Sequence, residues 1–383
     1  MWIPRITVTA LLTLVLGGCR EGVQPFMPDE REIEKGAAYA LTFGSGQDAD
    51  PRWSPDGDSV IYHTTLFNTV PQVSGVLLRI PARGGAAVPI LPDVQQAGGR
   101  PFVTPAYSPA SNRVAYLDML SVDVPSSCFR VDGGTPSCTT FQPLLDSALL
   151  RVRRIGESGS IALDPSITVR FAGTDPAHRF LAAGPWFEQF FPFQERYRLE
   201  HAMLFRPSWA PDGERLAFSD GLAIHSWRVG DPSSAIVPMT VNGVSAAWSP
   251  DGEWIAFTVL PRADSVVHQC SCPLGGLAIQ AFRTVYQSGP GVLMLVRPDG
   301  SERIELGEGE DPAWSPDGAF IYVRRAGRIA RIARAGGAVT PIANTEGGRS
   351  PAVSPDGTRL AFSRSKPSDV TLDYDIWIAT LAQ

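Results

Sequence analysis

The chain has 383 residues, of which 44 % are hydrophobic, and its 33 basic and 39 acidic side chains give a formal net charge of −6. This hydrophobic content is typical of a globular protein that buries a sizeable core. The acidic balance argues against a nucleic-acid partner, because proteins that bind nucleic acids present a basic face.

Residues 1–18 predict an exported protein. A positive charge at Arg5 precedes an apolar stretch at 6–16, which is shorter than the roughly 20 residues that cross a bilayer. A charged start, an apolar run and small residues form the order of a signal peptide. The sequence Leu-Gly-Gly-Cys at 16–19 resembles the lipobox of bacterial lipoproteins, which implies cleavage before Cys19 and lipid attachment to it.

A tether follows the expected lipid anchor. Residues 20–35 are charged, contain proline and show no period, so we expect 19–36 to be a flexible, lipidated tether. Arg20, rather than an aspartate, follows the cysteine. Within the resemblance to lipoproteins, this implies the periplasmic face of the outer membrane, with the inner membrane as the alternative.

One pattern then recurs six times. It consists of an aromatic or apolar residue, Ser/Ala-Pro-Asp-Gly, two further residues and an alternating apolar run. The copies are residues 50–63, 104–117, 206–219, 245–258, 311–324 and 350–363. The proline presets φ, the aspartate bonds nearby backbone and the glycine accepts a positive φ, so each copy predicts a tight turn between antiparallel strands. The second copy has Ala110-Ser111 instead of Asp-Gly.

Two further strand-like runs follow most copies, such as Val292–Val296 and Arg303–Leu306 after the fourth. Four strands per unit and six units predict an all-β, six-bladed β-propeller. The last unit ends with a third strand at Asp375–Thr380, and Ala38–Phe43 precedes the first copy. We therefore expect the N-terminal strand to close the last blade. Seven blades are the alternative, because the long stretch between the second and third copies could hold two.

This repeat resembles that of TolB-like propellers, a WD-type relative found in exported bacterial proteins, and the resemblance covers residues 37–383. It implies one propeller domain in the cell envelope. Nothing corresponds to the smaller domain that precedes the TolB propeller, so the resemblance does not imply a Tol partner. It also extends to the propellers of prolyl-oligopeptidase-type enzymes, whose hydrolase domain has no room here.

Insertions enlarge the minimal repeat at 65–74, 119–144, 165–202 and 260–289. Because antiparallel strands alternate in direction, these connections should all emerge on one face, which repeat proteins commonly use for binding. Segment 165–202 is rich in aromatic residues, including Trp186, Phe187, Phe190, Phe191 and Phe193. These residues form either a small core of the insertion or an exposed patch that contacts a partner or lipid.

A polar residue stands three positions before the repeat aromatic in each copy. These residues are Asp50, Thr104, Arg206, Ser245, Asp311 and Ser350. The first strand of a blade is innermost, so they should ring one mouth of the central channel. A small polar ligand or a peptide could bind there. The alternative is a polar ring that geometry alone requires.

The remaining cysteines suggest a disulfide in an exported chain. We predict a Cys128–Cys138 bridge, because it closes a short local loop, whereas a Cys270–Cys272 bridge would be strained and their pairing stays open. His268, Cys270 and Cys272 could ligate a metal, but oxidised thiols are the favoured state, so we expect no metal. His63 lies beside an inner strand, where a lone histidine is usually structural.

Motifs of catalysis are missing from the sequence. It contains neither a Gly-x-Ser-x-Gly elbow nor a phosphate-binding loop. We therefore expect no catalytic residues, no cofactor and a monomeric, lipid-anchored binding propeller that engages a protein, peptide or glycan of the cell envelope. The alternative is a carbohydrate-active lyase or hydrolase with its site at the channel mouth, and a third possibility is a purely structural envelope component.

Overall fold

The computed structural model describes much of the chain after residue 36. The described residues are 37–43, 47–67, 73–91, 101–129, 137–156, 164–170, 179–181, 203–221, 223–231, 237–241, 243–268, 272–274, 277–279, 282–287, 290–365 and 374–381. The expected signal peptide and tether, with Cys19, lie outside them. Within this described part, no helix has the length and apolar character needed to cross a membrane.

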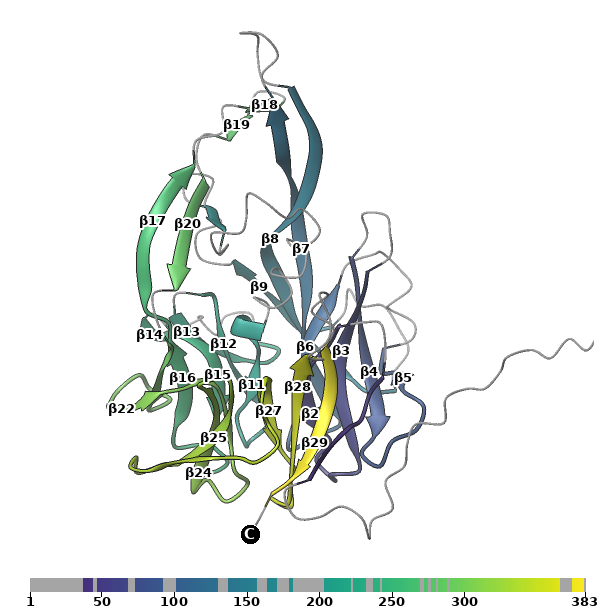
Figure 1. Ribbon diagram of the computed structural model, residues 1–383, viewed down its shortest axis with the longest axis vertical. Helices are drawn as coiled ribbons and strands as arrows, with labels where there is room; N and C mark the ends of the chain where they lie inside the picture. Colours follow the sequence, from purple (N-terminus) through teal and green to yellow (C-terminus); the bar gives the residue numbers. More distant parts are fainter. Residues whose placement is uncertain are drawn as a thin grey trace, which may run out of the picture.

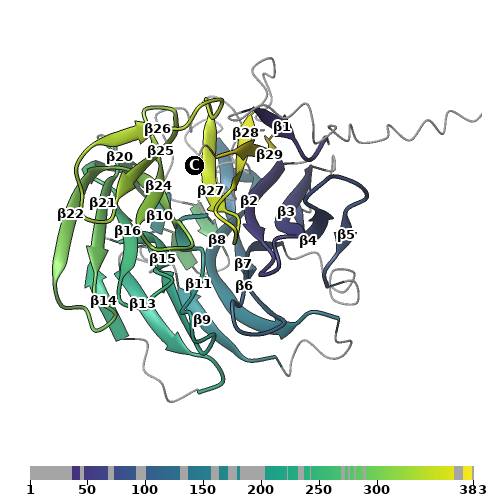
Figure 2. The same cartoon turned by 90° about the horizontal axis from the view of Figure 1, so that it is seen from below.

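Six antiparallel sheets of four strands form a ring, which Figure 2 shows from below. Blades one to three contain β2 (Gln47–Trp53), β3 (Ser59–Phe67), β4 (Val73–Pro81) and β5 (Val88–Pro89); β6 (Phe102–Tyr107), β7 (Arg113–Phe129), β8 (Ser137–Arg154) and β9 (Ser166–Arg170); and β11 (Ser208–Trp209), β12 (Arg215–Ser219), β13 (Ala223–Arg228) and β14 (Val237–Val241).

Blades four to six contain β15 (Val244–Trp248), β16 (Ile255–Val259), β21 (Val292–Val296) and β22 (Arg303–Glu308); β23 (Glu310–Trp314), β24 (Phe320–Arg325), β25 (Arg328–Ala333) and β26 (Val339–Pro341); and β27 (Gly348–Val353), β28 (Arg359–Ser365), β29 (Tyr374–Thr380) and β1 (Ala38–Ala40). The prediction of six four-stranded blades is confirmed. The seven-blade alternative is wrong, because the described part of the long stretch before β11 supplies one blade only.

The N-terminal strand closes the ring, as predicted. Strand β1 pairs antiparallel with β29, with Ala38 opposite Ala379 and Ala40 opposite Trp377. Beyond the strand, the Leu41 N–H donates to the Ile376 carbonyl at 2.7 Å. Blade six is thus built from both ends of the propeller sequence, and opening the ring requires β1 to leave β29.

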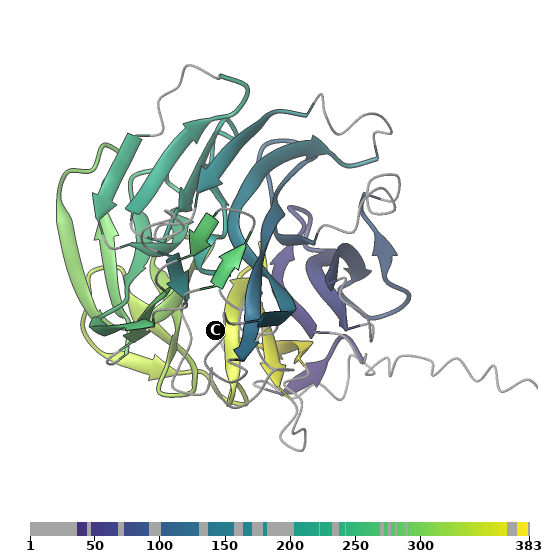
Figure 3. The same cartoon turned by 90° about the horizontal axis from the view of Figure 1, so that it is seen from above.

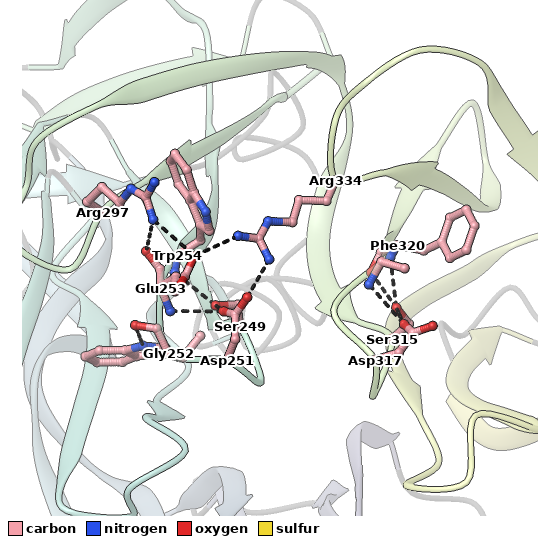
Figure 4. A network of polar contacts seen from close by, with 12 residues as sticks. Ser249, Asp251, Gly252, Glu253, Trp254, Arg297, Ser315, Asp317, Phe320 and Arg334 are labelled. Carbon is pink, nitrogen blue, oxygen red and sulfur yellow. Dashed lines mark hydrogen bonds and ion pairs between the residues drawn. The ribbon is translucent and has the colours of Figure 1, made fainter.

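The Ser-Pro-Asp-Gly turns work through the serine and aspartate side chains, as blade four shows (Figure 4). Ser249 Oγ donates to Asp251 Oδ1 at 2.6 Å, and the same carboxylate oxygen accepts the Glu253 N–H at 3.0 Å. The Trp254 N–H donates back to Ser249 Oγ at 2.9 Å. Gly252 takes a φ of +74°, which glycine adopts without a steric penalty. These bonds fix where the second strand of the blade begins.

In three blades the repeat tryptophan forms a hydrogen bond to the blade before it. The indole Nε1 of Trp53 donates to the Ala352 carbonyl, that of Trp209 to Ala106 and that of Trp314 to Ala247, each at 2.9 Å. Trp248 departs from this arrangement, since its Nε1 lies 3.3 Å from the Gly252 carbonyl of its own turn. Trp53, Trp209 and Trp314 therefore supply both apolar area and a hydrogen bond between blades.

The enlarged connections rise from one face of the ring, which we call the inserted face (Figure 1). Strands β7 and β8 continue as one hairpin far beyond the minimal blade, and β17 (Arg262–His268) pairs with β20 (Phe282–Gln287) above blade four. Two short strands, β18 (Cys272–Leu274) and β19 (Leu277–Ile279), pair with each other. From above, the two long hairpins lie over the same face (Figure 3).

The insertions also contact one another. Strand β10 (Arg179–Leu181), from the segment between blades two and three, pairs in parallel with β20 of blade four. The boundary of that segment differs from the expected 165–202, because Ser166–Arg170 form β9, the outermost strand of blade two. Likewise, much of 119–144 continues the strands β7 and β8 and is not a separate loop. The insertion between blades two and three therefore begins after Arg170.

Candidate functional site

Five of the six predicted channel residues occupy the same bulge of the first strand. The register with the second strand shifts by one residue at each of them, for example between Ala49 and Arg52. The five residues take a left-handed φ between +51° and +55°, and they are Asp50, Thr104, Ser245, Asp311 and Ser350. A bulge of this kind re-aims the side chain that it carries.

Blade three supplies the sixth residue differently. Arg206 and Pro207 precede the short β11 and follow the 3₁₀ turn η3 (Met203–Phe205). Arg206 is 2 % exposed. Its Nη2 donates to Asp311 Oδ1 at 3.0 Å and to Ser350 Oγ at 3.2 Å, and its Nη1 lies 3.5 Å from Asp50 Oδ1. One side chain of blade three therefore reaches blades one, five and six.

Two further contacts complete this axial cluster, by which we mean the six bulge-equivalent residues together with Arg52 and His63. Arg52 Nη2 lies 2.9 Å from Asp50 Oδ1, and Ser245 Oγ lies 3.4 Å from Asp311 Oδ1. Two guanidinium groups thus face two carboxylates, and their charges balance. The mixed charge predicted for the mouth of the channel is present, but the side chains are paired with each other and largely buried.

The charges fix the ionisation of Asp311. Burial works against the charged form, but the neighbouring guanidinium of Arg206, followed by those of Arg324 and Arg349, outweighs it and holds the pKa of Asp311 below its ordinary value. A carboxylate in this state accepts hydrogen bonds and does not donate protons near neutral pH. The arrangement therefore suits the holding of a cation.

His63 joins the cluster from β3. Burial lowers the pKa of His63 to about 4, so its imidazole is neutral near pH 7. Its Nδ1 accepts the N–H of Thr104 at 3.3 Å, which links blades one and two. This contact gives His63 a structural role at the bulge. The sequence placed His63 beside an inner strand without indicating this partner.

Two acceptor atoms of the axial cluster are buried without a hydrogen-bond partner among the described residues. Asp50 and Thr104 are both 0 % exposed, and neither Asp50 Oδ2 nor Thr104 Oγ1 has a hydrogen-bond partner. Asp50 belongs to blade one and Thr104 to blade two, whereas the contacts of Asp311, Ser245 and Ser350 lie on the side of blades four to six. Arg206 thus satisfies one half of the ring better than the other.

The remaining predicted sites are placed only in part. The aromatic residues Trp186, Phe187, Phe190, Phe191 and Phe193 lie outside the described residues, as do Cys19 and Cys270. Cys128 lies directly opposite Cys138 in the register of β7 and β8, which is the predicted pair, while the bond itself stays a prediction. Within the described ranges, no three His, Cys, Asp or Glu side chains are grouped as metal ligands would be.

The opposite face carries a paired charge network that the sequence did not indicate (Figure 4). The Arg297 guanidinium lies 3.9 Å from the centre of the Trp254 ring, and Arg334 lies on the same ring at 5.9 Å. Arg334 also binds Asp251, and its Nη2 lies 3.1 Å from Glu253 Oε2. Blades four and five are thus joined at their turns, and the charges there are matched by their neighbours.

Comparisons with known proteins bear on the fold alone. No family model and no curated sequence matches the chain. Among solved structures, TolB from Acinetobacter baumannii is 15 % identical with a TM-score of 0.45, over 89 % of this chain and 65 % of TolB. A putative TolB from Agrobacterium tumefaciens is 14 % identical with a TM-score of 0.45, over 90 % and 97 %.

The solved structures that match the chain also include an enzyme. An oligogalacturonate lyase in complex with manganese is 11 % identical with a TM-score of 0.40, over 92 % of this chain and 99 % of the lyase. Because the chain spans less than two thirds of the first TolB and identity is low throughout, these likenesses assign neither activity nor partner. The chain is a six-bladed β-propeller whose fold is similar to that of TolB.

Proposed function

We propose that the protein is a non-catalytic binding propeller, held in the cell envelope by lipid on Cys19, which engages a protein, peptide or glycan partner through its inserted face. The observation that carries the proposal is the contact between insertions. Strand β10 from between blades two and three and the β17–β20 hairpin of blade four form one sheet above the ring. A surface built jointly by separate insertions is the kind that repeat proteins use to bind.

The proposal is tested by crosslinking in cells followed by affinity capture. One variant replaces residues 171–202 with a short Gly/Ser linker and so retains β9. A matched control replaces residues 83–86, a turn on the opposite face, with Gly/Ser. We expect wild type and control to capture the same envelope component and the 171–202 variant to lose it, with rebinding of the purified component as confirmation. Equal capture by all three would contradict the proposed face.

Anchoring is tested separately. Lipid on Cys19 holds a protein at a membrane because each buried methylene group contributes about 0.8 kcal/mol and two or more chains hold firmly. Cys19→Ser should move the protein from the membrane fraction to the soluble fraction, and metabolic labelling with a fatty acid should be lost. Membrane association that survives the substitution would show that another part of the chain binds the membrane.

A carbohydrate-active lyase or hydrolase is the second candidate, supported by the convergence of Asp50, Asp311 and His63 at the axis. Glycoside hydrolysis needs one carboxyl group with a raised pKa, whereas the pKa of Asp311 is lowered by Arg206. Incubation of the purified protein with uronide and neutral oligosaccharides, followed by mass analysis of products, decides between the candidates. Turnover that is lost in Asp311→Asn would favour the enzyme.

A further inference from the structure

We propose that the axis of the ring is a receptor for a guanidinium or ammonium group of a ligand, and that Arg206 occupies this receptor until such a ligand displaces it. The inference rests on the binding function proposed above and specifies the chemistry of the ligand. The cation comes either from a free small molecule or from a side chain of the partner.

The acceptors that would hold the cation belong to the rigid part of the ring. Asp50, Asp311 and Ser350 sit in bulges of hydrogen-bonded first strands, and all three side chains point to Arg206. Two carboxylates with a hydroxyl between them match the several N–H groups of a guanidinium, which can serve more than one acceptor at a time. The two carboxylates would repel an anionic ligand, so the charge of the receptor excludes anions.

The cation that now fills the receptor belongs to a different kind of segment. Arg206 follows the 3₁₀ turn η3 and lies before β11, so its backbone is outside the strands of the ring. The chain reaches Arg206 directly from the insertion between blades two and three. The acceptors are therefore supplied by strands, while the guanidinium is supplied by a segment outside the strands.

Arg206 also satisfies the receptor incompletely. Its Nη1 is 3.5 Å from Asp50 Oδ1, which is longer than an ordinary charge-assisted hydrogen bond. Asp50 Oδ2 and Thr104 Oγ1 are buried and accept no hydrogen bond from the part of the chain that the structure describes, and a buried acceptor in that state is costly. A ligand cation placed closer to blades one and two would donate to these atoms. Because Arg206 leaves as the ligand enters, the axial cluster keeps its balance of charge.

The test is titration calorimetry of the purified full chain with N-acetyl-arginine amide. The matched neutral probe is N-acetyl-citrulline amide, which replaces the guanidinium by an uncharged group of similar shape. Arg206→Ala removes the internal competitor and should bind the arginine probe at least about tenfold more tightly than wild type, while the citrulline probe should not gain. Adding Asp311→Asn to Arg206→Ala should abolish the gain, because half of the receptor charge is lost.

No gain in Arg206→Ala, or an equal gain with the citrulline probe, would overturn the inference. If Arg206→Ala does not fold, Arg206→Lys decides: it keeps the charge but cannot serve Asp311, Ser350 and Asp50 together, so it should bind the arginine probe more tightly than wild type. Absence of that gain would equally overturn the inference. Free arginine, compared with the blocked probe, distinguishes a small-molecule ligand from a partner side chain. Crosslinking at the inserted face is independent of these titrations, so the two proposals can fail separately.

Discussion

Arg359 of the last blade lies over Trp53 of the first blade, with its guanidinium carbon 4.5 Å from the ring centre, and its Nη2 donates to the Gly57 carbonyl at 3.0 Å. This contact is a second fastening of the ring, on the opposite face from the insertions and separate from the β1–β29 pairing. The same relation recurs where Arg113 covers Trp209 and Arg215 covers Trp248.

Arg359→Ala should therefore weaken the seam between blades six and one. A stacked cation and one hydrogen bond are together worth about 1–2 kcal/mol, which urea denaturation would detect as a lower free energy of unfolding. Hydrogen exchange should quicken in β1 and β29 before other strands. Arg328→Ala, which breaks an exposed pair with Glu346, is the control and should cost less than about 0.5 kcal/mol. An equal loss in both variants would contradict the second fastening.

The indole bonds between blades can be compared within one chain. Trp314→Phe removes a hydrogen bond to the Ala247 carbonyl of the preceding blade, whereas Trp248→Phe removes a longer one to its own turn. Both substitutions delete the same atoms from similarly buried positions. Trp314→Phe should be more destabilising by about 1 kcal/mol in urea denaturation, because it leaves a carbonyl between blades unsatisfied. Identical losses would show that the indole serves only as apolar area.

The pairing of Arg206 with Asp311 predicts strong coupling between them. Arg206→Ala deprives the buried Asp311 carboxylate of its closest guanidinium and should cost about 3–5 kcal/mol of unfolding free energy. Asp311→Asn in the same chain removes one stranded charge, so the double variant should be more stable than the sum of the single losses. Additive losses in the double-mutant cycle would mean that the two side chains do not interact in solution.

His63 predicts loss of stability in mild acid. Its pKa falls from an ordinary 6.5 to about 4 on folding. Between these pH values the unfolded chain therefore binds a proton at His63 and the folded chain does not. Above about pH 6.5, His63 therefore makes its full contribution to the free energy of unfolding. This contribution is lost as the pH falls toward 4, and the loss is on the order of 3 kcal/mol. His63→Asn keeps an acceptor for the Thr104 N–H and should flatten this part of the Tm profile. An unchanged profile would show that another group controls the acid response.

The register of the long hairpin predicts a bridge near its tip. Cys128 and Cys138 are directly opposite in an antiparallel pair, where Cα atoms are about 4.5–5.5 Å apart and so within the range of a disulfide. Thiol alkylation of the exported protein without reductant should leave both cysteines unlabelled, and reduction should expose them together. Labelling of either one before reduction would contradict the bridge.

The sequence was sufficient for the blades because the turn chemistry is local. Ser315 and Asp317 determine their turn through hydrogen bonds that span at most five residues. The motif therefore predicts the same turn wherever it occurs. The six positions of the axial cluster could be picked out for the same reason, since each stands three residues before the aromatic or apolar residue of its repeat. Even the second copy, with Ala110-Ser111, keeps the turn, because Ser111 Oγ donates to Ser108 Oγ in place of the usual carboxylate.

Contacts between blades were harder to foresee. Arg359 and Trp53 are far apart in the sequence, although an arginine two residues after the turn glycine was a readable signal in two copies, and Arg113 holds the same position after Ser111. The parallel pairing of β10 with β20 joins two insertions of unrelated sequence, and no periodicity in the sequence predicts it. The reach of Arg206 across the axis depends on the late start of β11, which only the three-dimensional arrangement reveals.

The five left-handed bulges carry a consequence for engineering. Glycine adopts a φ near +50° freely, whereas serine, threonine and aspartate do so at a cost, yet none of the five positions is glycine. Ser245→Gly would remove the backbone strain at one bulge and so favour stability, at the loss of one hydroxyl near Asp311. A chain that keeps polar side chains at these positions is less stable than it could be, and functional sites commonly show this exchange of stability for function. Thermostabilised variants that spare the axis should therefore keep the ligand preferences of the parent.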